Sequence, residues 1–133
     1  MDPKSEHQKI KQPKEIRART FAYALRAVRL YQYLQGKKDG AGWILGKQYL
    51  RASTSIGTNV AEAQAGESRA DFIHKLAIAQ KEARESLFWL QLLSESKLVG
   101  TARLSPLVRE TEELIAVITV ILVSAKKTAA HQT

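Results

Sequence analysis

The sequence predicts an all-α protein, an up-down-up-down antiparallel four-helix bundle that forms a single domain. Three observations support this. Apolar residues recur at spacings of three and four in four long segments. Short stretches rich in glycine, serine, aspartate or proline separate the segments. The 133 residues include 3 prolines and no cysteine, so helices are rarely interrupted and the core is built without disulfides.

The first two helices are expected over residues 14–35 and 43–63. In the first, the spacing predicts a core stripe of Phe21, Ala24, Leu25, Val28, Tyr31 and Leu34. Three glycines and an aspartate between residues 36 and 42 favour a turn, and Gly66 is expected to end the second helix. The second helix has a predicted core stripe of Leu45, Tyr49, Ala52, Ile56, Val60 and Ala63. A mostly small flank would let another helix approach closely, and it consists of Gly46, Leu50, Ser53, Gly57 and Ala61.

The third helix is expected over residues 69–96, where Ser68 and Asp71 form a capping pattern at its start. Its predicted core stripe is Phe72, Leu76, Ala79, Ala83, Leu87 and Leu90. The fourth is expected over residues 106–125, with Ser105 as the cap and Pro106 at the first helical position. Its β-branched residues would also suit a strand, but this start signal and three early glutamates favour a helix. Short connections make consecutive helices antiparallel.

Both ends of the chain are predicted to be basic tails, a disordered one at residues 1–13 and another at 126–133. The formal net charge is +8, and more than half of the excess lies in residues 1–19 and at the C-terminal end. Such ends can hold a polyanion or simply keep the chain in solution. The candidate nucleic-acid-binding residues are Lys9, Lys11, Lys14, Arg17, Arg19, Arg26, Arg29, Lys126 and Lys127. No apolar run approaches the roughly 18 residues of a membrane span, and no signal peptide is recognisable, so a cytoplasmic protein is expected.

A polar stripe borders the apolar face of the second predicted helix. The stripe consists of Arg51, Ser55, Asn59 and Glu62. Its expected partners on the third helix include Lys81, Glu82, Arg84 and Glu85. We interpret the stripe as a structural network in which Arg51 meets a carboxylate and Asn59 and Glu62 meet Lys81 or Arg84. The alternative is a binding or catalytic cleft formed by the same residues.

No recognisable catalytic or cofactor motif accompanies this stripe. The three histidines, His7, His74 and His131, are scattered, and the Glu-x-x-His pattern of di-iron bundles does not occur. There is no Gly-x-Ser-x-Gly elbow and no glycine-rich phosphate loop. We therefore predict a protein that is not an enzyme and that needs neither metal nor cofactor. A cleft enzyme using Arg51, Asn59, Glu62 and Glu82 is the competing hypothesis.

Apolar surface on the third and fourth helices exceeds what one core needs. Phe88 and Trp89 are neighbours in the sequence and cannot both face the same core. One of them is expected to contact something beyond its own bundle, and a neighbouring subunit would serve.

The segment from Leu50 to Ala63, with 68–73 and 79–85, is similar to a bacterial family of four-helix bundle proteins first named for open reading frames in intervening sequences of 23S ribosomal RNA genes. The resemblance covers residues 14–125. It implies a left-handed up-and-down bundle that assembles as a homopentamer, and a biochemical role that is poorly defined. Family members often have glycine where this chain has Ala63.

In architecture, size and charge, though not in motif, the chain also resembles the accessory variability determinant of diversity-generating retroelements. That protein is a basic pentamer that binds nucleic acid and a reverse transcriptase. The predicted function is therefore non-specific RNA or DNA binding by a basic oligomer. The alternative is a structural or protein-interaction scaffold, such as an accessory subunit of a nucleic-acid enzyme.

Overall fold

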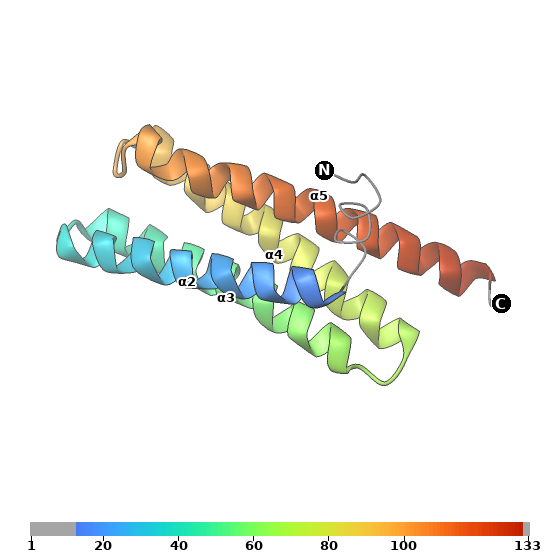
Figure 1. The fold of residues 1–133 in the computed structure, drawn as a ribbon. Helices are drawn as coiled ribbons and strands as arrows, with labels where there is room; N and C mark the ends of the chain where they lie inside the picture. Colours follow the sequence, from blue (N-terminus) through green and yellow to red (C-terminus); the bar gives the residue numbers. More distant parts are fainter. Residues whose placement is uncertain (1–12, 132–133) are drawn as a thin grey trace.

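The computed structural model describes residues 13–131 and shows four helices in antiparallel order (Figure 1). They are α2 (Pro13–Gly36), α3 (Gly40–Ala65), α4 (Arg69–Glu95) and α5 (Thr101–His131). The four-helix bundle predicted from the sequence is confirmed. The predicted N-terminal tail lies outside the described residues except for Pro13, which begins α2. None of the helices within residues 13–131 is long and apolar enough to cross a membrane.

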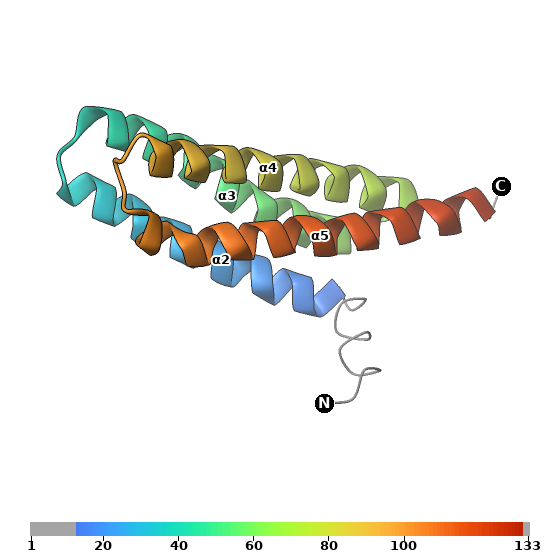
Figure 2. The same cartoon turned by 90° about the horizontal axis from the view of Figure 1, so that it is seen from above.

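Consecutive helices pack along their lengths, whereas α2 and α5 approach each other at few points. Figures 1 and 2 show α5 extending past the start of α2, alongside α4. The interface between α2 and α5 therefore closes the bundle less tightly than the other three.

The core consists of one cluster to which all four helices contribute. Residues of α3 and α4 follow the predicted stripes closely, with Tyr49, Ile56, Leu76 and Leu90 fully buried. Buried hydroxyl groups from three different helices meet in the core, those of Tyr23, Tyr49 and Thr111. Their hydroxyls satisfy one another: Tyr49 donates to Tyr23 over 3.0 Å, and the Tyr23 and Thr111 oxygens lie 2.5 Å apart.

The core stripe predicted for the first helix is wrong except at Leu34, which is buried. Phe21, Leu25 and Val28 point to the surface, and Phe21 is 66% exposed. The buried face is instead Ile16, Thr20, Tyr23, Ala27, Leu30 and Leu34. This face includes small and hydroxylated residues. How well they pack depends on the residues that α3 and α5 place opposite them.

Close approach between α2 and α3 explains that choice. A Cβ added at Gly46 would lie 2.8 Å from Leu34 Cδ1, and one at Gly57 would lie 3.4 Å from the carbonyl oxygen of Thr20. The small flank predicted for the second helix thus receives α2. A helix face that carries Thr20 rather than Phe21 fits against such a surface.

Helix ends differ from the predictions by three or more residues at three places. Helix α3 begins at Gly40 rather than residue 43, because the Asp39 carboxylate accepts a hydrogen bond from the Gly42 amide over 2.9 Å. Helix α5 begins at Thr101, so Ser105 and Pro106 lie within it, and the Ser105 hydroxyl donates to the Thr101 carbonyl. The predicted C-terminal tail is also corrected, since α5 continues through Lys126 and Lys127 to His131.

The cap predicted for the third helix is present. The Asp71 amide donates to the Ser68 hydroxyl over 3.1 Å. Left-handed backbone at the two other turns falls on Lys38 and Lys97, with φ of 55° and 62°, and not on a glycine. Gly36, Gly40 and Gly42 therefore lie at the ends of α2 and α3 beside the turn, and none of them is its left-handed residue.

Candidate nucleic-acid interface

Arg51 on α3 lies against two carboxylates of α4. Its Nη2 donates to Glu85 Oε1 over 2.5 Å, and its Nη1 lies 3.5 Å from Glu82 Oε2. The Trp89 indole donates to the same Glu85 oxygen over 3.3 Å. The hydrogen bond from Arg51 holds the pKa of Glu85 below its ordinary value. Burial raises the pKa of Glu82, which Arg51 opposes.

The other members of the polar stripe make local contacts. Asn59 Nδ2 donates to the Ser55 carbonyl, and the Ser55 hydroxyl donates to the Arg51 carbonyl. Glu62 pairs with Lys75 at 2.8 Å. The predicted contacts of Asn59 and Glu62 with Lys81 or Arg84 are therefore wrong, and Lys81 is exposed. These contacts go to separate partners, so among the described residues they do not join the four side chains into one network.

The basic residues predicted to bind nucleic acid fall into distinct environments. Arg19 makes a bidentate ion pair with Glu110, at 2.8 Å for both bonds, and also reaches Glu113. This pairing occupies the Arg19 guanidinium and lowers the pKa of Glu110. Arg17 lies beside an apolar hollow on α2 and α3.

Lys126 and Lys127 are exposed near the end of α5, while Lys9 and Lys11 and the side chain of Lys14 lie outside the described residues.

Arg26 and Arg29 line a groove of about 320 Å³ between α2 and α5. Arg103 of α5 joins them there with Tyr33, and the groove's apolar lining is Leu30, Pro106 and Leu107. The lining contains no Asp or Glu, although the charge of the nearby Glu110 interacts with Arg26. The groove lies at the interface between α2 and α5, which is less closely packed than the other three helix–helix interfaces. It therefore brings three arginines and an aromatic ring to one concave surface.

Tyr33 stacks with the basic groups around it. The Arg103 guanidinium carbon lies 3.9 Å from the Tyr33 ring centroid, and Lys37 Nζ lies 5.1 Å from it. Lys37 holds the pKa of the Tyr33 phenol below its ordinary value, with a smaller contribution from Arg103. The ring thus lies in a region of positive potential.

Sequence reasoning did not select Tyr33 or Arg103. Tyr33 is one helical turn from Arg29 on α2, which a search for aromatic residues beside basic ones would have found. Arg103 lies far away in the sequence and, in our prediction, in a loop. The antiparallel order of α2 and α5 brings the start of α5 beside the end of α2.

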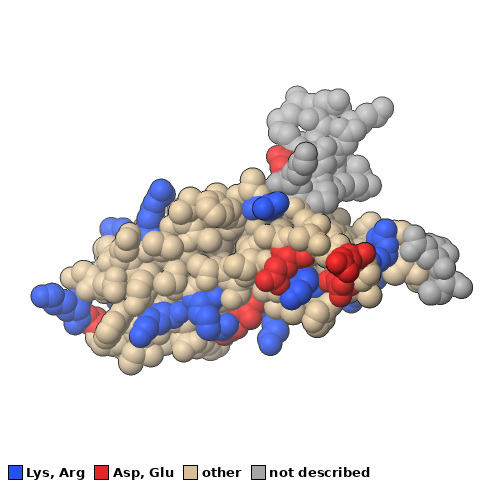
Figure 3. Space-filling model, turned by 90° about the horizontal axis from the view of Figure 1, so that it is seen from below, with Lys and Arg blue, Asp and Glu red and all other residues tan. Residues whose placement is uncertain are grey.

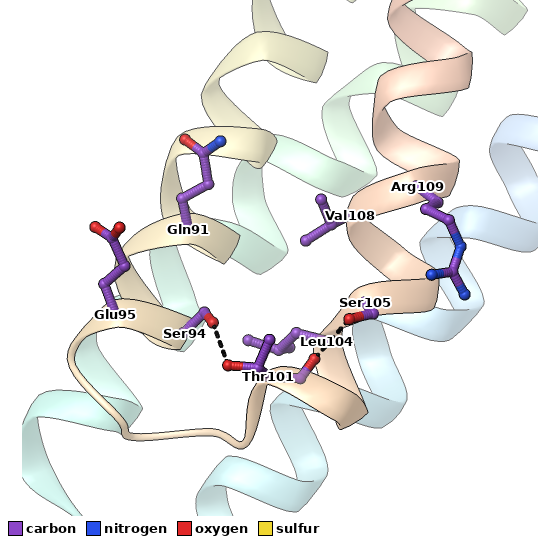
Figure 4. Close-up of a pocket in the computed structure, with 8 residues that line it drawn as sticks. All are labelled: Gln91, Ser94, Glu95, Thr101, Leu104, Ser105, Val108 and Arg109. Atoms are coloured by element: carbon purple, nitrogen blue, oxygen red, sulfur yellow. Dashed lines mark hydrogen bonds between the residues drawn. The ribbon is translucent and has the colours of Figure 1, made fainter.

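A second hollow, of about 450 Å³, lies at the α4–α5 turn (Figure 4). It is lined by Gln91, Ser94, Glu95, Thr101, Leu104, Ser105, Val108 and Arg109. The Ser94 and Thr101 hydroxyls are 3.1 Å apart, and the Ser105 hydroxyl is bonded to a helix carbonyl. Figure 4 shows Glu95 and Arg109 extending to opposite sides. The polar groups are therefore satisfied locally or point apart, and they do not converge on a ligand.

Charged residues on the underside of the molecule are dispersed. Figure 3 shows Lys and Arg spread along this face, with Asp and Glu beside several of them and broad uncharged surface between. Exposed apolar side chains contribute to the uncharged surface of α2 and α3, among them Phe21 and Ile44. Within residues 13–131 no group of three or more acidic or histidine side chains could hold a metal ion.

Comparisons with known proteins relate this chain to one family. The model of the family described as 23S rRNA-intervening sequence protein matches residues 14–120. Among solved structures, the chain is similar to a protein of unknown function from the S23 ribosomal protein family of Bacteroides thetaiotaomicron, with 34% sequence identity and a TM-score of 0.76. The match covers 83% of this chain and 96% of that chain. No curated protein matches the chain.

Proposed function

Because the chain belongs to the 23S rRNA-intervening sequence protein family, we propose that it is a nucleic-acid-binding bundle that contacts RNA or DNA through basic side chains. The observation that carries the proposal is the groove between α2 and α5, where Arg26, Arg29 and Arg103 meet. None of the three takes part in the ion pairs found among the described residues, whereas Arg19, Arg51 and Lys75 do.

Electrostatics supports a polyanionic ligand. The chain has a formal net charge of +8, and basic residues that contact phosphates release counterions from the nucleic acid. Such binding has little sequence preference and weakens steeply with salt. Guanidinium groups are well suited to it, because each presents several fixed donors to phosphate oxygens.

Binding of fluorescein-labelled RNA and DNA, followed by anisotropy over a range of salt concentrations, tests the proposal. The triple variant R26Q/R29Q/R103Q is expected to bind more weakly. For a single strand, the slope of the logarithm of the binding constant against the logarithm of the salt concentration should also become shallower by about 2. The control R69Q/K81Q/R84Q removes the same charge from exposed positions on α4. Equal losses in both variants would show that net charge matters but the groove does not. No binding by the unaltered protein at low salt and micromolar concentration would refute the function itself.

Assembly into a homo-oligomer is the second part of the proposal, with a pentamer expected from the family resemblance. Large apolar side chains remain exposed on the isolated bundle, including Phe21 at 66%, Ile44 at 62% and Phe88 at 56%. A pentamer would carry five times +8, about +40, which would strengthen attraction to a polyanion. Light scattering on a size-exclusion column should give about 74 kDa, five times 14.8 kDa. A mass of one chain would contradict it.

The same exposed apolar residues favour a second candidate function, a protein-interaction scaffold. A scaffold would form a stable complex with a specific protein and show no affinity for RNA or DNA. The anisotropy experiment separates the two functions, because the scaffold predicts no binding at any salt concentration. For either function we propose that the protein is located in the cytoplasm and acts by binding its partner, without catalysing a reaction.

A further inference from the structure

We propose that the groove between α2 and α5 selects single-stranded nucleic acid, with an unpaired base stacked on the Tyr33–Arg103 pair and the flanking phosphates held by Arg26 and Arg29. This inference rests on the proposed function and names the ligand class of the same site. It commits to a flexible single strand rather than a duplex.

The shape of the groove favours a single strand. Its volume of about 320 Å³ is small, its lining includes Leu30, Pro106 and Leu107, and guanidinium groups from both helices border it. A single strand can turn one base into such a hollow and leave its phosphates outside. A duplex keeps its bases stacked and paired inside, so it presents phosphates to the groove but no free base face.

The pairing of Tyr33 with Arg103 provides a platform on which a base can stack. Their separation of 3.9 Å brings a phenol ring and a guanidinium together in a cation–π contact. Bases stack on aromatic rings and on guanidinium planes alike, and such stacking tolerates any base sequence. The contact couples the end of α2 to the start of α5, so the platform is held by two helices before a ligand arrives.

The arrangement of charge around that platform supports the same ligand. Arg26, Arg29 and Tyr33 recur at spacings of three and four on α2, so they lie along one helix face. Arg103 approaches from α5, and Lys37 lies 5.1 Å from the Tyr33 ring. The depressed pKa of the Tyr33 phenol is consistent with this concentration of positive charge. Phosphates on either side of a stacked base would therefore meet a cation.

The test compares an unstructured 12-nucleotide RNA with a 12-base-pair RNA duplex that contains the same strand, at one low salt concentration. The unaltered protein should bind the single strand more tightly. Tyr33→Leu keeps the charge but removes the ring, and it should weaken single-strand binding roughly fivefold or more with little effect on the duplex. Tyr33→Phe retains the ring and should bind as the unaltered protein does. Trp43→Leu is the matched control, because it removes a partly exposed aromatic ring that has its own cation–π contact, with Lys47, outside the groove.

A second variant keeps the inference testable if Tyr33→Leu does not fold, which circular dichroism would reveal. Arg103→Lys preserves the charge and loses the planar guanidinium, so it should weaken binding of the single strand more than that of the duplex. Equal binding of both RNAs, unchanged in the Tyr33 and Arg103 variants, would overturn the single-strand inference and leave the proposed function intact. Binding of neither RNA would overturn both.

Discussion

At the scale of single residues, the contacts of the hydroxyl groups in the core imply a donor order. Tyr49 of α3 donates to Tyr23 of α2, and Thr111 of α5 donates to the Leu107 carbonyl over 2.6 Å. Because the one hydroxyl hydrogen of Thr111 is used there, Tyr23 must donate to Thr111. Three helices are thus connected by polar contacts inside an apolar core. Burial raises the pKa of both tyrosines, so the hydroxyls stay protonated and able to donate.

The two tyrosines should therefore respond differently to loss of the hydroxyl. Tyr23→Phe removes the acceptor of Tyr49 and leaves that buried hydroxyl without its partner, which should cost about 1–3 kcal/mol of unfolding free energy. Tyr49→Phe removes only the outermost donor and should cost less, about 1 kcal/mol. Urea denaturation of both variants measures the difference. Equal costs would contradict the inferred donor order.

Arg19 and Glu110 provide a pH-dependent contribution to stability. The hydrogen bond from Arg19 lowers the pKa of Glu110 in the folded protein below its ordinary value of 4.5. The contribution is therefore fully present above pH 4.5 and is lost as pH falls through the lower, folded pKa. Arg19→Gln should lower the free energy of unfolding by about 1 kcal/mol at pH 7, and this deficit should shrink towards pH 3.

Unfolding of Arg19→Gln and of the unaltered protein at pH 7 and pH 3 checks this dependence. Arg84→Gln serves as the control, because Arg84 is exposed and outside the described ion pairs. A deficit that stays constant between the two pH values would show that Arg19 acts through packing and not through the Glu110 charge.

At the scale of helices, α5 carries a proline inside its N-terminal part. Pro106 has no amide hydrogen, so the carbonyl of Ala102 lacks the hydrogen bond that a helix would normally supply. Both residues are exposed, which lets water reach that carbonyl. The helix nevertheless begins at Thr101, where the Arg103 and Leu104 amides donate to the Gly100 carbonyl. A proline near the start of a helix does not by itself mark the first helical position.

Pro106→Ala should stabilise the protein, because it restores one helix hydrogen bond and removes a poor helix former. The free energy of unfolding is expected to rise by about 1 kcal/mol or more, less than the ~3 kcal/mol of a helix interior. Chemical denaturation measures the change, and hydrogen exchange at residue 106 would report the restored amide bond. A loss of stability would indicate that the Pro106 ring packs against the groove in a way alanine cannot replace.

At the scale of the whole molecule, two kinds of surface take no part in packing the four helices together. The groove between α2 and α5 is basic, and the exposed face of α2 is apolar around Phe21, Leu25 and Val28. Beside Phe21 lies a largely apolar hollow of about 550 Å³ whose lining includes Gly57 and Ala61 of α3. Contiguous exposed apolar surface is typical of a subunit interface.

Phe21→Lys should therefore break the proposed oligomer into single chains. The phenylalanine is mostly exposed in the isolated bundle, so the helical circular dichroism should not change. Light scattering on a size-exclusion column gives the mass, and Ala116→Lys on the exposed side of α5 is the control for one added positive charge. If Phe21→Lys keeps the mass of the unaltered protein, the α2 face does not form the interface.

Much of this protein follows from its sequence alone. Periodic apolar residues determine four helices, and short connections make them antiparallel, because a short link cannot carry the chain back along the bundle. The Ser68 cap and the buried stripe of α3 also follow from local patterns. A capping residue and its partner lie within one helical turn, and burial on one side places apolar residues at helical spacing. The family resemblance, based on motifs of the second and third helices, is confirmed by the family model over residues 14–120.

Tertiary structure decided which of two apolar faces of α2 enters the core. Phe21 and Tyr23 belong to different faces of the same helix. The face with Phe21 is the more apolar and was predicted to be buried, but the face with Tyr23 is the buried one. The buried face fits close to Gly46 and Gly57 and satisfies the Tyr23 hydroxyl, and both conditions depend on other helices. The basic groove likewise depends on bringing Arg103 to Tyr33, which only the packing of α5 beside α2 achieves. Local periodicity reports how apolar a face is, whereas its fit to a neighbouring helix is a property of the assembled bundle.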